Sequence, residues 1–114
     1  MSHLSILPTV LRDEDLLVQA LQDLSLPVER GGELRGFADQ REAVAVRARL
    51  PQGLWLGWAR QPDGQLALVG DLQRLGRSTS LQQLIGQITR RYAARLALRE
   101  LQGDWAGAQV ELVS

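Results

Sequence analysis

The sequence contains no cysteine and no lysine, and it has one histidine and few aromatic residues. Without cysteine, a disulfide framework and thiol chemistry are excluded. Without lysine, amine nucleophiles and Schiff-base chemistry are excluded, and all thirteen cations are arginines. A single histidine, His3, cannot form a His-based metal cluster or a His pair. We therefore expect no metal and no cofactor.

Long apolar runs are also missing, and at least about 18 such residues are needed to span a bilayer, so we predict no membrane insertion. The first residues lack the basic flank and apolar core of a signal peptide, which makes a cytoplasmic location our default expectation. Thirteen basic residues balance thirteen acidic ones, which argues against a nucleic-acid binder driven by long-range attraction. The length of 114 residues predicts a single domain, residues 1–114.

The longest helical pattern extends from Ser80 to Leu101. Its apolar residues recur at steps of three and four, as on one face of a helix packed against a sheet. These residues are Leu81, Leu84, Ile85, Ile88, Tyr92 and Leu96. Ser80 with Gln83 forms a capping-box pattern at the start, and Gly103 is a stop signal. This helix is predicted to cover the sheet.

Shorter elements surround this helix. Asp13 precedes a helical stripe that ends near Ser25, where Pro27 prevents continuation. Turn signals separate segments of strand length, which we predict at 2–10, 28–30, 34–37, 43–50, 54–60, 65–70 and 109–113. The fold class is therefore α+β: one antiparallel sheet with two helices on one face, in the order β-α-β-meander-α-β, loosely ferredoxin-like.

Several short motifs occur in an order that resembles a known family. They include Ser2-His3-Leu4-Ser5, Arg35-Gly36-Phe37, Leu56-Gly57-Trp58, Leu68-Val69-Gly70-Asp71 and Arg91-Tyr92-Ala93. In this order they resemble the uncharacterised cyanobacterial and plastid family that includes hypothetical chloroplast reading frame thirty-five, a domain of unknown function. The resemblance covers roughly residues 2–96. It implies a cyanobacterial or plastid setting and supplies no catalytic residues.

The candidate site lies on the sheet face that the two helices leave open. By strand parity, His3, Arg47, Arg49 and Trp55 share this face. Arginines beside an indole can hold a carboxylate, a phosphate or a planar group. The alternative is a solvated face on which the arginines pair with Glu29 or Glu42.

Residues 70–80 connect a strand to the long helix and superficially resemble a phosphate-binding loop. The spacing of the glycines is wrong, and arginine replaces the required lysine. We interpret the segment as an ordinary capped connection, with weak anion binding by Arg77, Ser78 and Ser80 at the helix N-terminus as the alternative.

The apolar face of the long helix changes direction near its end, where Leu98 and Leu101 leave the main stripe. Either Trp105 and the last strand cover these leucines as a local cap, or Leu98, Leu101 and Trp105 form an interaction patch. We favour the cap, because Gly103 would let the chain reverse.

We hypothesise a non-enzymatic binding or adaptor protein that uses the open sheet face for an unknown protein partner or for self-association as a homo-oligomer. One alternative is a small-ligand or anion receptor on the same face. A second alternative is a minor enzyme that uses His3 with arginines, although neither a carboxylate cluster nor a nucleophile elbow supports it.

Overall fold

The computed structural model describes the backbone of residues 3–113 and the side chains of residues 3–51 and 53–103. Its helices are α1 (Glu14–Asp23), α2 (Leu72–Gly76) and α3 (Thr79–Val113), with a 3-10 turn at Pro51–Gly53. The strands are β1 (Ser5–Leu7), β2 (Val28–Arg30), β3 (Glu33–Arg35), β4 (Arg41–Ala43), β5 (Val46–Arg49), β6 (Trp55–Arg60) and β7 (Leu66–Gly70). The predicted α+β class is confirmed.

Five strands form the main sheet in the order β1-β7-β6-β5-β2, and every neighbouring pair is antiparallel. Because β1 and β2 occupy opposite edges, no two parallel strands are adjacent, and the sheet lacks the split βαβ pairing of a ferredoxin-like fold. The loose ferredoxin likeness expected from the sequence is therefore wrong. The strands β3 and β4 form a separate two-stranded sheet.

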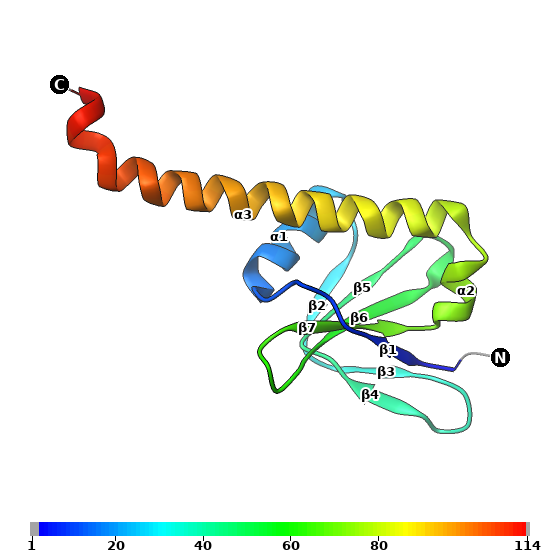
Figure 1. Cartoon of the computed structure of the whole chain (residues 1–114). Helices are drawn as coiled ribbons and strands as arrows, with labels where there is room; N and C mark the ends of the chain where they lie inside the picture. Colours follow the sequence, from blue (N-terminus) through cyan, green and yellow to red (C-terminus); the bar gives the residue numbers. More distant parts are fainter. Residues whose placement is uncertain (1–2, 114) are drawn as a thin grey trace.

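One face of the main sheet carries the helices, with α1 and α2 between the sheet and α3 (Figure 1). The predicted apolar stripe of α3 lies in this core, where Leu81, Ile88 and Tyr92 are buried and Leu84, Ile85 and Leu96 are partly buried. From the sheet, Leu56, Trp58 and Leu68 point to the same side. The core is thus a sheet layer under a helix layer, as the helical periodicity predicted.

Hydrogen bonds tie α1 to α3. Asp13 is the N-cap of α1 and accepts from the Leu16 N–H at 3.0 Å. Tyr92 of α3 is buried, and its hydroxyl accepts from the backbone N–H groups of Arg12 and Asp13 at 3.1 and 2.9 Å. The hydroxyl therefore satisfies donors at the start of α1 that no helical carbonyl reaches.

Arg99 reinforces this join between the helices. Its Nη1 atom lies 2.6 Å from Asp13 Oδ2, and this hydrogen bond, followed by the one from the Leu16 N–H, lowers the pKa of Asp13 from 3.8. Arg95 lies 2.5 Å from Asp23 at the other end of α1, and its hydrogen bond likewise lowers the pKa of Asp23. The basic end of the described part of α3 thus clamps both ends of α1.

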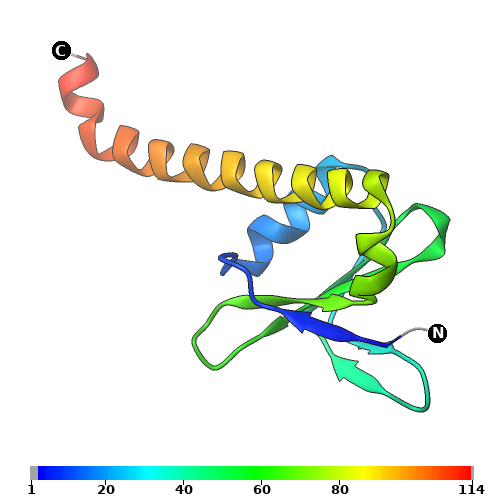
Figure 2. The same cartoon turned by 45° about the vertical axis from the view of Figure 1, so that its right-hand side comes forward.

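The other face of the main sheet is not open, because the β3–β4 hairpin lies across it (Figure 2). Leu34, Val44 and Val69 form a second buried cluster between the hairpin and the sheet. The sequence pattern had merged two elements here: the strand predicted at 43–50 is divided into β4 and β5. The chain passes from the hairpin to the main sheet at Val44 and Ala45.

The strand predicted at residues 2–10 is shorter in the structure, and its apolar side chains lie on the other face of the sheet. It comprises Ser5–Leu7 rather than residues 2–10, and Val10 is 79% exposed. Ile6 is opposite Val69 in the ladder, and Leu4 packs against the cluster under the hairpin. Leu4 and Ile6, which were predicted to face the helices, therefore lie on the hairpin side of the sheet.

The C-terminal predictions are also wrong. The structure continues α3 through Gly103 to Val113, so Gly103 does not stop the helix and the strand predicted at 109–113 is helical. The chain does not reverse over Leu98 and Leu101, which are 54% and 57% exposed. The predicted cap is therefore not formed at these leucines. The side chain of Trp105 lies outside the described residues.

Candidate functional site

The site begins with a glycine in β6 that lets the hairpin approach the sheet. A Cβ atom built on Gly57 would lie 2.5 Å from Val44 Cγ1 and 3.0 Å from Leu34 Cδ1. Contacts this short do not occur between real side chains, so a larger residue would push the hairpin outward. Gly57 therefore sets the height of the hairpin above the sheet.

Two polar anchors hold the hairpin in place. The Gln40 side chain accepts from the Leu4 N–H at 2.9 Å and donates to the Leu4 carbonyl at 2.9 Å, which joins the hairpin to the edge of β1. At the opposite side, Arg47 Nη1 donates to the Glu33 carbonyl at 2.9 Å. The hairpin is thus fastened at both sides.

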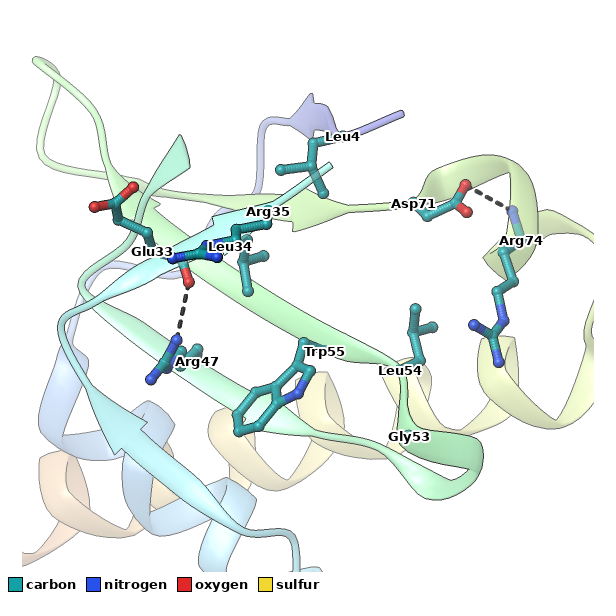
Figure 3. Close-up of a pocket in the computed structure, with 10 residues that line it drawn as sticks. All are labelled: Leu4, Glu33, Leu34, Arg35, Arg47, Gly53, Leu54, Trp55, Asp71 and Arg74. Carbon is teal, nitrogen blue, oxygen red and sulfur yellow. Dashed lines mark hydrogen bonds between the residues drawn. The ribbon is translucent and has the colours of Figure 1, made fainter. Parts of the chain in front are cut away.

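A hollow of about 380 Å³ lies on this face beside the hairpin. Trp55 lies in its middle in the view of Figure 3, with Arg47 on one side and Arg74 on the other. The hollow has both apolar and charged walls. Its lining residues are Leu4, Glu33, Leu34, Arg35, Arg47, Gly53, Leu54, Trp55, Asp71 and Arg74.

The charged groups of the hollow are held by specific contacts. The guanidinium carbon of Arg47 lies 5.1 Å from the centroid of the Trp55 ring, and its Nε donates to Glu29 at 2.9 Å. Asp71 is only 8% exposed, and its carboxylate caps α2 by accepting from the Arg74 N–H at 3.1 Å. Arg47 is therefore stacked and oriented before any ligand binds, as a cation–π contact with an ion pair favours.

More arginines than acidic residues line the hollow. Three arginines line it against two acids, and the Asp71 carboxylate is occupied as a helix cap. In Figure 3 the Glu33 carboxylate points away from the Trp55 ring. Three guanidinium groups thus line the hollow, one of which, that of Arg47, is already paired with Glu29. Guanidinium groups beside an indole suit an anionic group that has a planar or apolar neighbour.

The four residues predicted to share this face are only partly brought together. Arg47 and Trp55 line the hollow, and the predicted cross-strand pairing of Arg47 with Glu29 is confirmed. Arg49 is opposite Trp55 in the ladder but is exposed beside Gly53. The side chain of His3 is exposed and packs edge-on against Phe37, with ring centroids 5.5 Å apart. His3 precedes β1 and does not line the hollow, where its neighbour Leu4 lies instead.

A second hollow, of about 340 Å³, lies on the same sheet face near the turn between β6 and β7. Its walls include Ile6, Pro8, Pro62 and Ala67. No arginine lines it among the residues that the structure describes. It is the more apolar of the two hollows and offers little that would orient a charged ligand.

The start of α3 shows an ordinary helix cap. Ser78 Oγ accepts from the Leu81 N–H at 3.2 Å, and Ser80 Oγ lies 3.2 Å from Ser78 Oγ, so Ser78 and not Ser80 is the cap. Arg77 is exposed at the end of α2. The helix α2 itself was not predicted, although aspartate, here Asp71, is a typical N-cap residue.

The sequence interpretation missed most of the wall of the first hollow. Leu4, Leu34 and Leu54 were assigned to strands, and Arg35 and Arg74 were given no role. Turn signals at Gly31-Gly32 and Ala38-Asp39-Gln40 marked the hairpin that brings them together. They did not show that the hairpin folds across the sheet, because that contact depends on packing at Gly57.

The described residues limit the chemistry of the site. Within them, no group of three or more acidic or histidine side chains is placed to hold a metal ion. Over the same part of the chain, no helix has both the length and the apolar character needed to cross a bilayer. His3 lies outside the hollow, so the geometry does not join it to the arginines there.

Comparison with known proteins places the chain at the level of a family. Neither the curated proteins nor the solved structures gave a match. A family model described as "Protein of unknown function (DUF1257)" matches residues 20–112, which run from the last turn of α1 through β2–β7 and α2 to Leu112 of α3. The chain therefore belongs to this family of proteins of unknown function.

Proposed function

We propose that this protein is a non-enzymatic binding or adaptor module that holds an acidic segment of a protein partner in the hollow beside Trp55. One observation carries the proposal: Arg47 is stacked on Trp55 and anchored by Glu29 and the Glu33 carbonyl at the wall of a hollow of about 380 Å³. Such a preformed guanidinium and indole pair would bind with little ordering cost.

The hairpin restricts how a partner can approach this face of the sheet. It covers the middle of the sheet face at Gly57 and Val69, so two copies cannot stack flat through these sheets. A chain end or loop that bears a carboxylate beside an apolar side chain fits the hollow better. Its carboxylate would meet Arg47 or Arg74, and its apolar part would lie on Trp55 and Leu54.

The size of the hollow also supports a second candidate, a receptor for a small anionic ligand. Ligand pockets usually enclose about 300–1,000 Å³, and this hollow falls within that range. The resemblance to the cyanobacterial and plastid family supports a protein of that origin, so a cyanobacterial lysate is the proposed source of either binder.

Affinity capture from such a lysate, followed by mass spectrometry, tests the proposal. Arg74→Glu reverses a charge within the hollow, and Arg77→Glu makes the same change nearby but outside it. We expect the wild type and Arg77→Glu to retain the same partner, and Arg74→Glu to bind it at least about tenfold more weakly.

Three outcomes separate the candidates. Loss of the partner with Arg77→Glu alone would place the site at the start of α3 instead of the hollow. Capture of a small anion without any protein, detected by mass spectrometry of the eluate, would favour the receptor. Retention by both variants would refute the hollow as the site. Circular dichroism of each variant checks that the fold is intact.

A further inference from the structure

The far end of α3 forms a second surface, independent of the hollow. From Ala97 to Gly103 every residue of α3 is exposed, and beyond α1 the helix projects from the rest of the molecule (Figure 1). Leu98 and Leu101 are 54% and 57% exposed there. With Ala94 they lie at steps of four and three, the spacing of a coiled-coil stripe.

The sequence continues this stripe along the helical backbone to Val113. Trp105, Ala108 and Leu112 follow Leu101 at steps of four, three and four. Gly103 and Gly107 also lie in this part of the helix, and glycine inside a helix is destabilising. A helix of this kind, alone in water, is marginal without a packing partner.

Charge is divided along the same helix. Residues 90–99 contain four arginines and no acid, whereas residues 100–114 contain three acids and no cation. Because α3 is one continuous helix, its acidic part cannot fold back onto its own basic part. Within the same chain, Arg91 and Arg95 already pair with Asp23 and Arg99 pairs with Asp13, so among the described residues Arg90 is the arginine of this part without an ion pair. An antiparallel second copy would set Arg90 beside the acidic part of its partner, and a parallel copy would set like charges together.

The described surface has room for that second copy. Two further hollows, distinct from those on the sheet face, lie along α3 and have volumes of about 300 and 380 Å³. Both are lined by Ala94 and Arg91. Leu98 lines the first, and Arg90 lines the second. The small Ala94 side chain between these hollows leaves space for a large residue from another helix.

We propose that two copies of this chain pair through an antiparallel contact between the ends of their α3 helices. The spacing fits one register, in which Leu98 meets Leu101 of the second copy. This register sets Ala94 opposite Trp105 of the second copy and Arg90 beside its Glu111. The contact is isologous, so each charge pair occurs twice.

Sedimentation equilibrium of the full chain tests the pairing. We expect a monomer–dimer equilibrium for the wild type, and a dissociation constant at least about a hundredfold higher for Leu98→Asp, since each interface would bury two unpaired carboxylates. Ala93→Asp is the matched control, because it adds the same charge at an exposed α3 position off the stripe. A wild type that stays monomeric, or a dimer unaffected by Leu98→Asp, would overturn the proposal.

A charge exchange tests the antiparallel register. Arg90→Glu would set acid against Glu111 in its own dimer, and Glu111→Arg would set arginine against Arg90, so each variant should dimerise about tenfold more weakly. Mixing the two variants restores both opposite-charge pairs, and we expect a heterodimer of wild-type affinity. A mixture no tighter than the separate variants would contradict this register.

Discussion

Gly57→Ala is expected to lift the hairpin from the sheet, although the change adds only one methyl group. The new Cβ would lie 2.5 Å from Val44 Cγ1 and 3.0 Å from Leu34 Cδ1, both within the buried cluster under the hairpin. Overpacking of this kind costs about 1–3 kcal/mol of the free energy of unfolding. Because Leu34 also lines the hollow, partner binding should weaken as well.

Chemical denaturation of four variants gives the test: Gly57→Ala, Gly76→Ala, Val44→Ala and the double variant. Gly76→Ala is the control, since no atom lies within 4 Å of the Cβ added there. Val44→Ala removes the methyl that clashes, so the double variant with Gly57→Ala should lose less stability than the sum of the two single changes, by roughly 0.5–3 kcal/mol. If Gly57→Ala costs no more than Gly76→Ala, the hairpin does not pack on β6 as described.

Three further predictions concern the core, the helix clamp and the hairpin anchor. Ile88→Ala should lower the free energy of unfolding by about 2–5 kcal/mol, because Ile88 is 1% exposed; a loss below about 1 kcal/mol in urea would contradict its burial. Because the pKa of Asp13 is lowered in the folded state, this carboxylate should stabilise the fold at pH values above its ordinary pKa of 3.8. This contribution should vanish as the pH falls through the folded-state pKa. Arg99→Gln should therefore reduce the stability lost on acidification, as measured by unfolding at several pH values. Gln40→Ala should remove both side-chain bonds to Leu4, cost about 1–2 kcal/mol, and speed hydrogen exchange of the Leu4 N–H; unchanged exchange would count against the anchor.

Local patterns in the sequence were sufficient for the helical layer. The stripe of α3 and the cap at Asp13 each depend on residues a few positions apart, and both are present in the structure. Packing follows directly from such a stripe, since an apolar helix face must cover another apolar surface. The α+β class was predictable for the same reason.

The hairpin side was harder to predict because alternation alone does not say which surface a strand faces. Val44 and Val46 alternate as in one strand, yet Val44 is buried under the hairpin and Val46 is buried under the helices. A bend between these valines carries the chain from the hairpin into the main sheet, while the alternation of apolar residues continues unbroken. The same ambiguity reversed the predicted face of β1 and misplaced His3.

The candidate site was therefore only half predictable. Arg47 and Trp55 were found by parity within strands, which is a local property. Arg74 and Leu4 reach the hollow through the position of α2 and through the Gln40 anchor, and these contacts join segments far apart in the sequence. The end of α3 was missed because Gly103 is compatible with either a stop or a continued helix.

The indole N–H signals of selectively labelled tryptophan report whether the partner binds in the hollow. Trp55 lies in the hollow, and Trp58, which is 2% exposed on the helix side of the same strand, serves as an internal reference. When the captured partner is added, we expect the NMR signal of Trp55 to shift and that of Trp58 to stay unchanged. A partner that binds with the Trp55 signal unchanged would contradict the assignment of the hollow as the binding site.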